Sequence, residues 1–301
     1  MKSPINNSSN TNLLERIEVN EIVKSYKRVY NIDVEKYFFN LKSIDVYICC
    51  DTGYRFYYPF NISGDSDFYI HFQNFDWYYM PWKWEHEVSL DLILPNYKVL
   101  EVGCGKGEFL KKIHKQKGVS CVGLELNETS SYQSDGVKIE NTLVEKFSLD
   151  NKDQFDIVCS FQVLEHISSV YSFIQAQVDC LKKGGLLLVC VPNNESTLLK
   201  SKRHLLNMPP HHMGLWDEKS LGALEKYFNI RLKKIIFEPI QPYHFDMFTA
   251  IKLESYFGTL LTRVIVKSSK LLGLNKIVHK SMNRRASSIR GHSIMAVYEK
   301  I

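Results

Sequence analysis

The chain has 301 residues, of which 45% are hydrophobic and 24% charged, which is enough to bury one large core with appendages. Its seven cysteines are scattered without metal-ligand spacing, so they indicate reduced thiols in a cytoplasmic protein, and no metal site is predicted. The longest uncharged apolar run, residues 186–191, is too short to cross a membrane. The polar residues 1–12 indicate a disordered tail rather than a signal peptide.

The N-terminal segment, residues 1–84, is predicted to form a cap of helices and a β-hairpin. Residues 13–40 place apolar side chains at helical spacing, which predicts helices. In residues 44–59, β-branched and aromatic residues flank a short turn, which predicts a hairpin with Gly53 at the positive-φ position. A helix over residues 85–93 is expected to follow the cap.

Residues 72–84 are dense in aromatic rings. One interpretation is a core that docks the cap onto the following domain. The other is a lid over a ligand, because aromatic rings with polar tips suit the wall of a partly solvated pocket. Both interpretations can hold together. The rings are those of Phe75, Trp77, Tyr78, Tyr79, Trp82 and Trp84.

A glycine-rich turn follows the first strand of the next domain. Apolar residues 99–102 run into Gly103, Gly105 and Gly107, and a helical pattern begins directly afterwards. Glycines in such a turn allow positive φ and a close approach of the backbone to a ligand. A dinucleotide fingerprint would place its third glycine one position later, where Glu108 stands.

The following segments alternate strands and helices. The second strand ends at Glu125, where an acid can accept hydrogen bonds from both hydroxyls of a ribose. Helices are predicted over residues 170–181 and 220–228, and an antiparallel closing strand over residues 293–300. The other predicted strands are residues 137–139, 155–160, 184–193 and 230–237.

This order of motifs resembles the class I S-adenosylmethionine-dependent methyltransferases. The pattern E-x-G-x-G-x-G, an acid after the second strand, then F-D-I-V…L-E-H, L-K-x-G-G and P-N all occur in family order. The resemblance covers roughly residues 95–240 and the last ten residues. It implies an α/β, Rossmann-like, seven-stranded and mostly parallel sheet with helices on both faces. The methyltransferase domain would span residues 85–301.

The resemblance also implies S-adenosyl-L-methionine as cofactor and names the residues that hold it. Glu101 would anchor the turn and the methionine moiety, and Glu125 the ribose. The acid or amide that usually meets adenine falls near Leu143, so backbone amides, packing or Asn141 would replace it. The implied cofactor-binding residues are Glu101, Gly103, Cys104, Gly105, Gly107, Glu125, Leu126, Asn141 and Phe161.

Three histidines are candidate catalytic bases, because methylation of a hydroxyl requires alignment and removal of a proton. His166 follows the fourth strand, and its alternative role is a hydrogen-bonded loop staple. His211 and His212 lie in a loop after the fifth strand. The alternative interpretation of His211 and His212 is that they belong to a turn stabilised by Pro209 and Pro210.

A basic insertion, residues 241–290, precedes the last strand. Residues 250–290 hold nine Lys or Arg and one acid, Glu254, a balance of +8 against +5 for the whole chain. Apolar positions at three- and four-residue spacing predict an amphipathic helix or helix pair. It would pack on the fold, capture an anionic acceptor, or attach peripherally to an anionic membrane through residues 252–285. Nucleic acid is not expected, because interleaved aromatic residues are missing.

The motifs most resemble the branch of ubiquinone-biosynthesis-like O-methyltransferases and bacterial surface-glycan-cluster methyltransferases. The hypothesis is therefore O-methylation of a small molecule or of a lipid- or nucleotide-linked sugar, at a cytoplasmic location that extends to the inner face of the membrane. The alternative is a binding or scaffold protein with a methyltransferase fold and no transferase activity. The sequence leaves the oligomeric state open.

Overall fold

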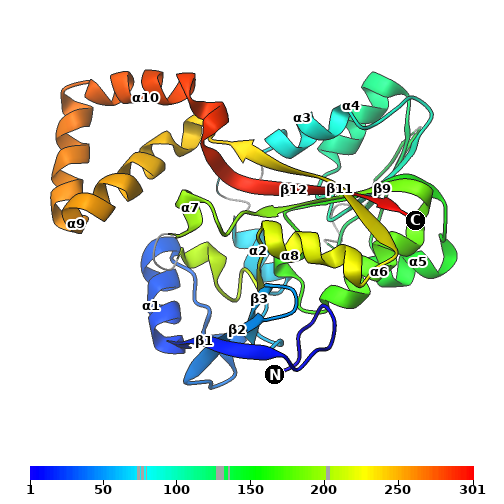
Figure 1. Ribbon diagram of the computed structural model, residues 1–301, viewed down its shortest axis with the longest axis horizontal. Helices are drawn as coiled ribbons and strands as arrows, with labels where there is room; N and C mark the ends of the chain where they lie inside the picture. Colours follow the sequence, from blue (N-terminus) through cyan, green and yellow to red (C-terminus); the bar gives the residue numbers. More distant parts are fainter. Residues whose placement is uncertain (73–74, 76–77, 79, 127–131, 135, 201–203) are drawn as a thin grey trace.

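The computed structural model describes residues 1–72, 75, 78, 80–126, 132–134, 136–200 and 204–301 (Figure 1). Its centre is a large mixed sheet of eight strands, in which β9, β8, β4, β5 and β7 pair in parallel. In spatial order the strands are β11 (Ile230–Pro239), β12 (Arg290–Lys300), β9 (Leu181–Pro192), β8 (Phe155–Phe161), β4 (Lys98–Val102), β5 (Ser120–Leu124), β7 (Val137–Glu140) and β6 (Tyr132–Ser134).

The expectation of seven strands was wrong by one edge strand. The extra strand, β6, has three residues and pairs antiparallel with β7. A strand this short carries too little alternation to be recognised in sequence. The closing strand β12 pairs antiparallel with both β9 and β11, as the alternating residues 293–300 predicted.

Helices cover both faces of the large sheet, so two cores form (Figure 1). Along β4, Val99 belongs to the core beside α4, whereas Leu100 belongs to the core beside α6, because successive side chains of a strand point to opposite faces. One face carries α3 (Trp84–Leu90) and α4 (Glu108–Lys117); the other carries α5 (Val144–Asp150), α6 (Val170–Cys180) and α8 (Glu218–Gly222).

The cap contains a second, four-stranded antiparallel sheet, called here the cap sheet. The predicted hairpin is confirmed: β2 and β3 are joined by a turn in which Gly53 has a φ of 76°. The two-residue strand β10, which comes after β9 in the chain, completes the sheet by pairing with β3. The cap sheet runs in the order β1 (Thr11–Glu18), β2 (Ser43–Cys49), β3 (Arg55–Tyr58) and β10 (Gly214–Leu215).

Two predictions for the N-terminus were wrong. Residues 13–18 form strand β1 rather than a helix, and the helix α1 (Val19–Tyr30) begins only afterwards. The apparent helical spacing was misleading because Leu13 is exposed on β1, while Ile17 is buried. Residues 1–10 are an ordered segment, since the side chain of Ile5 is completely buried in the core beside α6.

The described aromatic residues of 72–84 pack in two cores. Phe72, which ends the short helix α2 (Ser66–Phe72), joins the core of the cap, against which Phe75 and Tyr78 pack. Trp82 and Trp84 pack against the core beside α4. This segment therefore docks the cap onto the large sheet, as one interpretation predicted. Trp77 and Tyr79 lie outside the described residues.

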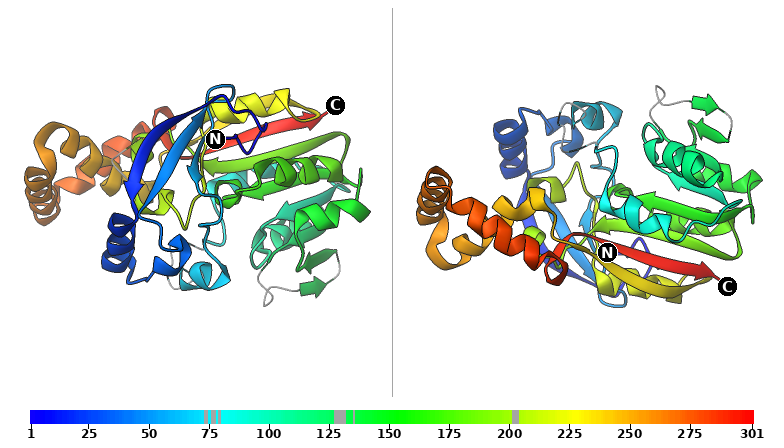
Figure 2. Two further views of the ribbon diagram at one scale, coloured as in Figure 1. Left: turned by 90° about the horizontal axis from the view of Figure 1, so that it is seen from below. Right: turned by 90° about the horizontal axis from the view of Figure 1, so that it is seen from above.

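The predicted basic insertion is a helical arm that projects beyond the large sheet (Figures 1 and 2). Its long helix α9 (Phe245–Leu271) bends at Gly258, where φ is 71° and ψ is 169°, and α10 (Leu274–Arg284) follows. The expectation that its apolar side packs on the fold was wrong, because Tyr256, Leu260 and Leu271 are each about 80% exposed. Among the described residues, no helix is both long and apolar enough to cross a membrane.

Candidate active site

The glycine turn lies where β4 ends, at the edge of the sheet to which the parallel strands point their carboxyl ends. The backbone N–H groups of Gly103 and Cys104 donate to the carbonyl of Leu124 at 2.8 and 3.1 Å, which fixes the turn against the end of β5. All three glycines have positive φ, between 53° and 76°. This geometry explains the glycines at these positions, because L side chains rarely adopt it.

The surroundings of Gly103 and Gly105 differ. A Cβ on Gly103 would collide with the side chain of Val163, whereas a Cβ on Gly105 would meet no atom within 4 Å. Gly103 is therefore needed for packing between the ends of β4 and β8. Gly105 instead borders open space, where a ligand can approach the backbone.

Glu125 lies against this turn, as the sequence predicted. Its Oε2 accepts a hydrogen bond from the N–H of Gly105 at 2.9 Å. The side chain of Asn141 donates to the backbone carbonyl of Glu125 at 3.0 Å, and Leu126 beside it is 56% exposed. The ends of β5 and β7 therefore bring Glu125, Leu126 and Asn141 to one side of the turn. Leu143 is also exposed and precedes the first residue of α5.

Glu101 is a buried acid at the end of β4. Only 4% of the residue is exposed, and its Oε2 has no hydrogen-bond partner among the described residues. Burial raises its pKa well above the usual value, and the charges of Glu125 and Glu85 raise it further. A buried carboxylate without a partner is costly unless a ligand supplies a donor or a positive charge.

Two further buried acids were not predicted as site residues. Glu85 of α3 and Glu165 are 3% and 2% exposed, and each has one carboxylate oxygen without a partner among the described residues. Burial raises the pKa of Glu85, and it raises that of Glu165 to about 8. Only the tertiary fold buries Glu85, so no local sequence signal marks it. With Glu101 and Glu125, these acids form the carboxylate cluster.

Aromatic rings close this end of the site. The ring of Phe161 packs edge-on against Phe109 at a centroid distance of 5.4 Å, and His86 stacks on Phe109 at 5.0 Å. Burial lowers the pKa of His86 to about 3, so its ring is neutral. His86 was also not predicted. Of the aromatic segment, Trp82 contacts these rings, at centroid distances of 5.2 Å to His86 and 6.0 Å to Phe109.

The three candidate histidines meet at the other end of the site and form the histidine cluster. His166 lies in the 3-10 turn η3 (Leu164–His166) after β8, and the loop after η4 (Leu205–Asn207) carries His211 and His212. The ring centroids of the three residues are 4.4–4.9 Å apart. Burial lowers the pKa of His166 to about 4 and those of His211 and His212 well below the usual value, so all three are neutral near pH 7.

The cap holds the loop that carries His211 and His212. The hydroxyl of Tyr26 lies 3.1 Å from the carbonyl of Leu205 and 3.2 Å from that of Met208. The hydroxyl of Tyr57 donates to the carbonyl of Asn207 at 2.8 Å. Met213 then links η3 to the cap sheet, because its N–H donates to the backbone carbonyl of Glu165 and its own carbonyl accepts from the N–H of Tyr57.

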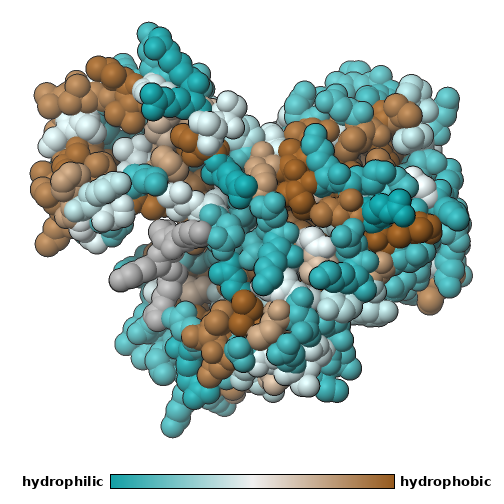
Figure 3. Space-filling model, viewed as in Figure 1, coloured by the Kyte–Doolittle hydropathy of each residue, from teal (hydrophilic) through white to brown (hydrophobic). Residues whose placement is uncertain are grey.

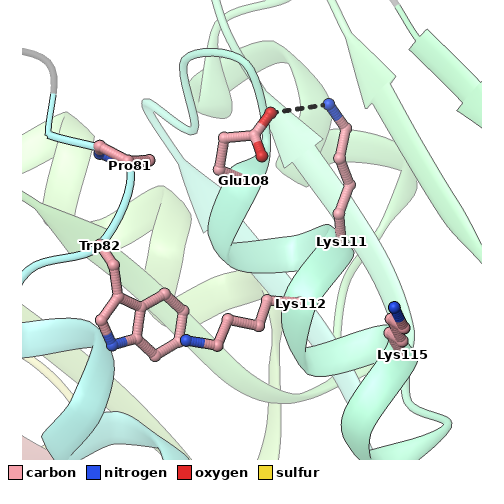
Figure 4. Close-up of a pocket in the computed structure, with 6 residues that line it drawn as sticks. All are labelled: Pro81, Trp82, Glu108, Lys111, Lys112 and Lys115. Atoms are coloured by element: carbon pink, nitrogen blue, oxygen red, sulfur yellow. Dashed lines mark hydrogen bonds and ion pairs between the residues drawn. The ribbon is translucent and has the colours of Figure 1, made fainter.

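A separate surface pocket of about 340 Å³ lies along the outer side of α4 (Figure 4). Trp82 and Lys112 form one wall, where the ammonium group of Lys112 sits 3.3 Å from the centroid of the indole ring. Lys111 pairs with Glu108 at 3.1 Å. None of the predicted cofactor or catalytic residues lines this pocket.

Comparisons with known proteins bear on the family to which this chain belongs. A family model described as a methyltransferase domain matches residues 77–232. The ubiquinone biosynthesis O-methyltransferase of Pelagibacter ubique is 28% identical over 164 residues, which cover 49% of this chain and 67% of that protein. The mitochondrial enzyme of the same name from Dictyostelium discoideum is 25% identical over 181 residues, covering 50% and 56%.

Other similar proteins differ in what their names describe. A tRNA U34 carboxymethyltransferase of Pseudomonas aeruginosa is 30% identical over 155 residues, which cover 48% of this chain and 47% of that protein. A SAM-dependent methyltransferase structure from Archaeoglobus fulgidus has a TM-score of 0.49 and 17% identity, covering 78% of this chain and all of that one. The chain thus spans about half to two thirds of the curated relatives described here. The family match, which extends over more than half of the chain, identifies it as a member of the class I S-adenosylmethionine-dependent methyltransferases.

Proposed function

We propose that this protein transfers a methyl group from S-adenosylmethionine to a hydroxyl of a small molecule or of a lipid- or nucleotide-linked sugar. The observation that carries the proposal is the unpartnered buried oxygen of Glu101 beside the open space at Gly105. S-adenosylmethionine carries a sulfonium and an ammonium group, and a site with several buried carboxylates favours such cations.

The proposed cofactor contacts follow the edge of the sheet. The backbone of Gly103, Cys104 and Gly105 would lie under the methionine and ribose, and Glu125 would accept hydrogen bonds from the ribose hydroxyls. Gly107 shapes the turn, while Asn141 and Leu126 border the adenine side. The backbone carbonyl groups near Phe161 would accept hydrogen bonds from the amino group of the methionine moiety.

The bound cofactor supplies an electrophilic methyl group, and the protein has to align the acceptor and take up its proton. The histidine cluster would line the acceptor and could accept hydrogen bonds from its hydroxyl, but the lowered pKa values of His166, His211 and His212 make these rings weak bases near pH 7. The names of the ubiquinone-biosynthesis relatives support an oxygen acceptor. We therefore propose a hydroxyl rather than an amine as the methylated group.

We further propose that residues 85–301 form the methyltransferase domain, with residues 1–84 as its cap, and that the arm contacts an anionic membrane surface. Side chains of the arm combine exposed apolar groups with nine Lys or Arg in residues 250–290 (Figure 3). Such a combination favours headgroup attraction with shallow apolar insertion. A surface-bound enzyme would reach a lipid-linked acceptor directly.

Calorimetry with S-adenosylhomocysteine tests the cofactor assignment. The wild-type protein is expected to bind one equivalent, and Glu125→Ala is expected to bind at least about tenfold more weakly, since hydrogen bonds to charged groups contribute about 1.5–3 kcal/mol. Lys112→Ala, in the pocket outside the site, serves as the matched control and should bind like the wild type. Failure of the wild type to bind would contradict the proposal and favour a binding or scaffold protein.

The acceptor class is tested by transfer of a labelled methyl group to a panel of phenols, nucleotide sugars and lipid-linked glycans. Alkali-stable label on oxygen in one of these classes is the expected outcome. Label on nitrogen or carbon only would contradict O-methylation while leaving the cofactor assignment intact.

A further inference from the structure

The histidine cluster has the geometry of a metal site as well as that of a set of bases. One ring nitrogen from each of His166, His211 and His212 lies within 4.8 Å of the others. The sequence could not indicate this arrangement, because 45 residues separate His166 from His211 and no local ligand spacing exists. The fold brings them together by placing the loop after β9 against the end of β8.

Each ring has its Nδ1 held by an oxygen acceptor. The Nδ1 of His166 lies 2.5 Å from the carbonyl of His211, and that of His211 lies 2.7 Å from the carbonyl of Leu206. The Nδ1 of His212 lies 3.1 Å from Oδ1 of Asn207. Because these oxygens only accept, each Nδ1 carries the proton and each Nε2 carries a lone pair. Metal-bound histidines in proteins are oriented by the same kind of hydrogen bond.

Burial keeps the three imidazoles neutral, as metal ligands must be. His211 and His212 are 4% and 6% exposed, and their rings stack at a centroid distance of 4.4 Å. A proton on either ring would be opposed by burial and by the neighbouring rings.

A buried carboxylate stands next to this cluster. Oε1 of Glu165 lies 3.9 Å from Nε2 of His166, and its Oε2 has no partner among the described residues. A carboxylate at this distance can serve as a fourth ligand after a small shift, or it can accept a hydrogen bond from a metal-bound water. Glu165 thus adds a potential oxygen ligand beside the three imidazoles.

We propose that His166, His211 and His212 bind a divalent transition-metal ion of the Zn²⁺ type. Neutral imidazoles suit Zn²⁺, Co²⁺ and Ni²⁺, whereas Mg²⁺ and Ca²⁺ prefer oxygen ligands. Three protein ligands leave a position for water or a hydroxyl. The Tyr78 hydroxyl now lies 2.7 Å from Nε2 of His211, so binding exchanges that hydrogen bond for a metal bond.

The consequence for catalysis rests on the proposed function. A hydroxyl that binds the open position would lose its proton more readily, because a bound cation lowers the pKa of its oxygen ligand. The neighbouring imidazoles would then orient the acceptor through the metal rather than act as free bases. Metal binding itself does not depend on the cofactor or the acceptor, so it can be measured separately.

The test is a titration of chelator-treated, full-length protein with Co²⁺, followed by its visible d–d absorption in the absence of cofactor and acceptor. One equivalent is expected to bind, and Zn²⁺ is expected to displace it whereas Mg²⁺ does not. His166→Asn, His211→Asn and His212→Asn should each lower the affinity at least tenfold. Asparagine keeps a donor near the place of Nδ1 but removes the Nε2 ligand, so a mere loop staple would tolerate it.

Two variants control this experiment. His114→Asn changes another histidine, whose Nδ1 is held by the carbonyl of Val119, and should leave Co²⁺ binding unchanged. Tyr78→Phe removes the competing hydrogen bond and should bind Co²⁺ at least as tightly as the wild type. No absorption with the wild type, or equal absorption in the three cluster variants, would overturn the proposal even if methyl transfer were demonstrated.

Discussion

At the scale of single residues, Gly103 and Gly105 have similar backbone conformations but different neighbours. Gly103→Ala should destabilise the protein by about 1–3 kcal/mol, since it combines a strained backbone with a collision against Val163. Gly105→Ala carries only the backbone cost, about 1–2 kcal/mol. Urea unfolding of both variants measures the difference. The difference in unfolding free energy should narrow when both glycine variants are made in a Val163→Ala background, where the collision is relieved and the cost of Val163→Ala itself cancels; an unchanged difference would show that the collision is not its cause.

Substitution of Glu101 is expected to have opposite effects on the stability of the ligand-free protein and on its affinity for the cofactor. Because burial raises its pKa, the folded chain holds a proton that the unfolded chain releases above pH 4.5, and stability falls as the pH rises above that value. Glu101→Gln removes this cost, so the ligand-free variant should unfold at a higher temperature than the wild type at pH 8 but not at pH 4.5. Its affinity for S-adenosylhomocysteine should nevertheless fall. A variant less stable at pH 8, or one that binds as well as the wild type, contradicts this account.

The sequence placed the glycine turn and Glu125 well, because both depend on local backbone geometry at the ends of adjacent strands. It did not reveal Glu85, Glu165 or His86 as site residues. Their burial arises when α3 and the loop after β8 pack over the turn, and no spacing within the chain encodes that contact. Long-range packing, rather than local chemistry, limits the prediction here.

At the scale of elements, the arm is joined to the large sheet by a closed pair of strands. Pro239 on β11 lies opposite Arg290 on β12, and the N–H of Ile240 donates to the carbonyl of Ile289. Replacing residues 241–288 by a short Asn-Gly turn should therefore keep the sheet intact. Of the residues in α9 and α10, only Phe245 and Thr262 are buried, so the loss of stability should be small.

This arm deletion also tests the membrane proposal. The wild type should bind anionic vesicles more tightly than neutral ones, and added salt should weaken that binding. The deletion variant should lose vesicle binding and keep its affinity for S-adenosylhomocysteine. Vesicle binding that survives the deletion, or that ignores salt, contradicts the assignment of the arm.

The elements that the sequence predicted best are those with long, regular patterns. The buried run in β9 was found because a central strand with both faces covered is apolar throughout, and β12 was found from its alternating residues. β1 was mistaken for a helix since most of its side chains face outward, so that its pattern carries little information. β10, with two residues, depends wholly on its partner β3.

For the whole molecule, two buried titratable groups, His86 and Glu238, predict a broad stability maximum between about pH 4.5 and 6.5. The pKa of His86 is lowered to about 3, so its contribution is present above pH 6.5 and is lost as the pH falls through 3. The pKa of Glu238 is raised to about 7, so its contribution is present below pH 4.5 and is lost as the pH rises through 7. Thermal midpoints measured from pH 3 to 9 should therefore fall below pH 4.5 and above pH 6.5, because the two contributions oppose each other between those values.

Two substitutions test whether His86 and Glu238 cause the decline of the thermal midpoint on the acid and the alkaline side. His86→Gln should remove the decline below pH 4.5, and Glu238→Gln should remove the decline above pH 6.5 and keep the loss of stability toward acid pH. The glutamine at 238 can still accept from the N–H of Ser293, which Glu238 now does at 2.8 Å. If both variants kept the wild-type profile, other groups would control the pH dependence.

The tyrosines of the cap that hold the histidine loop have a consequence for how this protein can be divided. Tyr26 and Tyr57 belong to the first 84 residues, yet they bond to the carbonyls that shape the loop after η4. A fragment beginning at residue 85 would keep the glycine turn but lose the support that orients His211 and His212. The N-terminal segment therefore helps to hold the histidine cluster in place, and the cap cannot be exchanged as an independent module without releasing that loop.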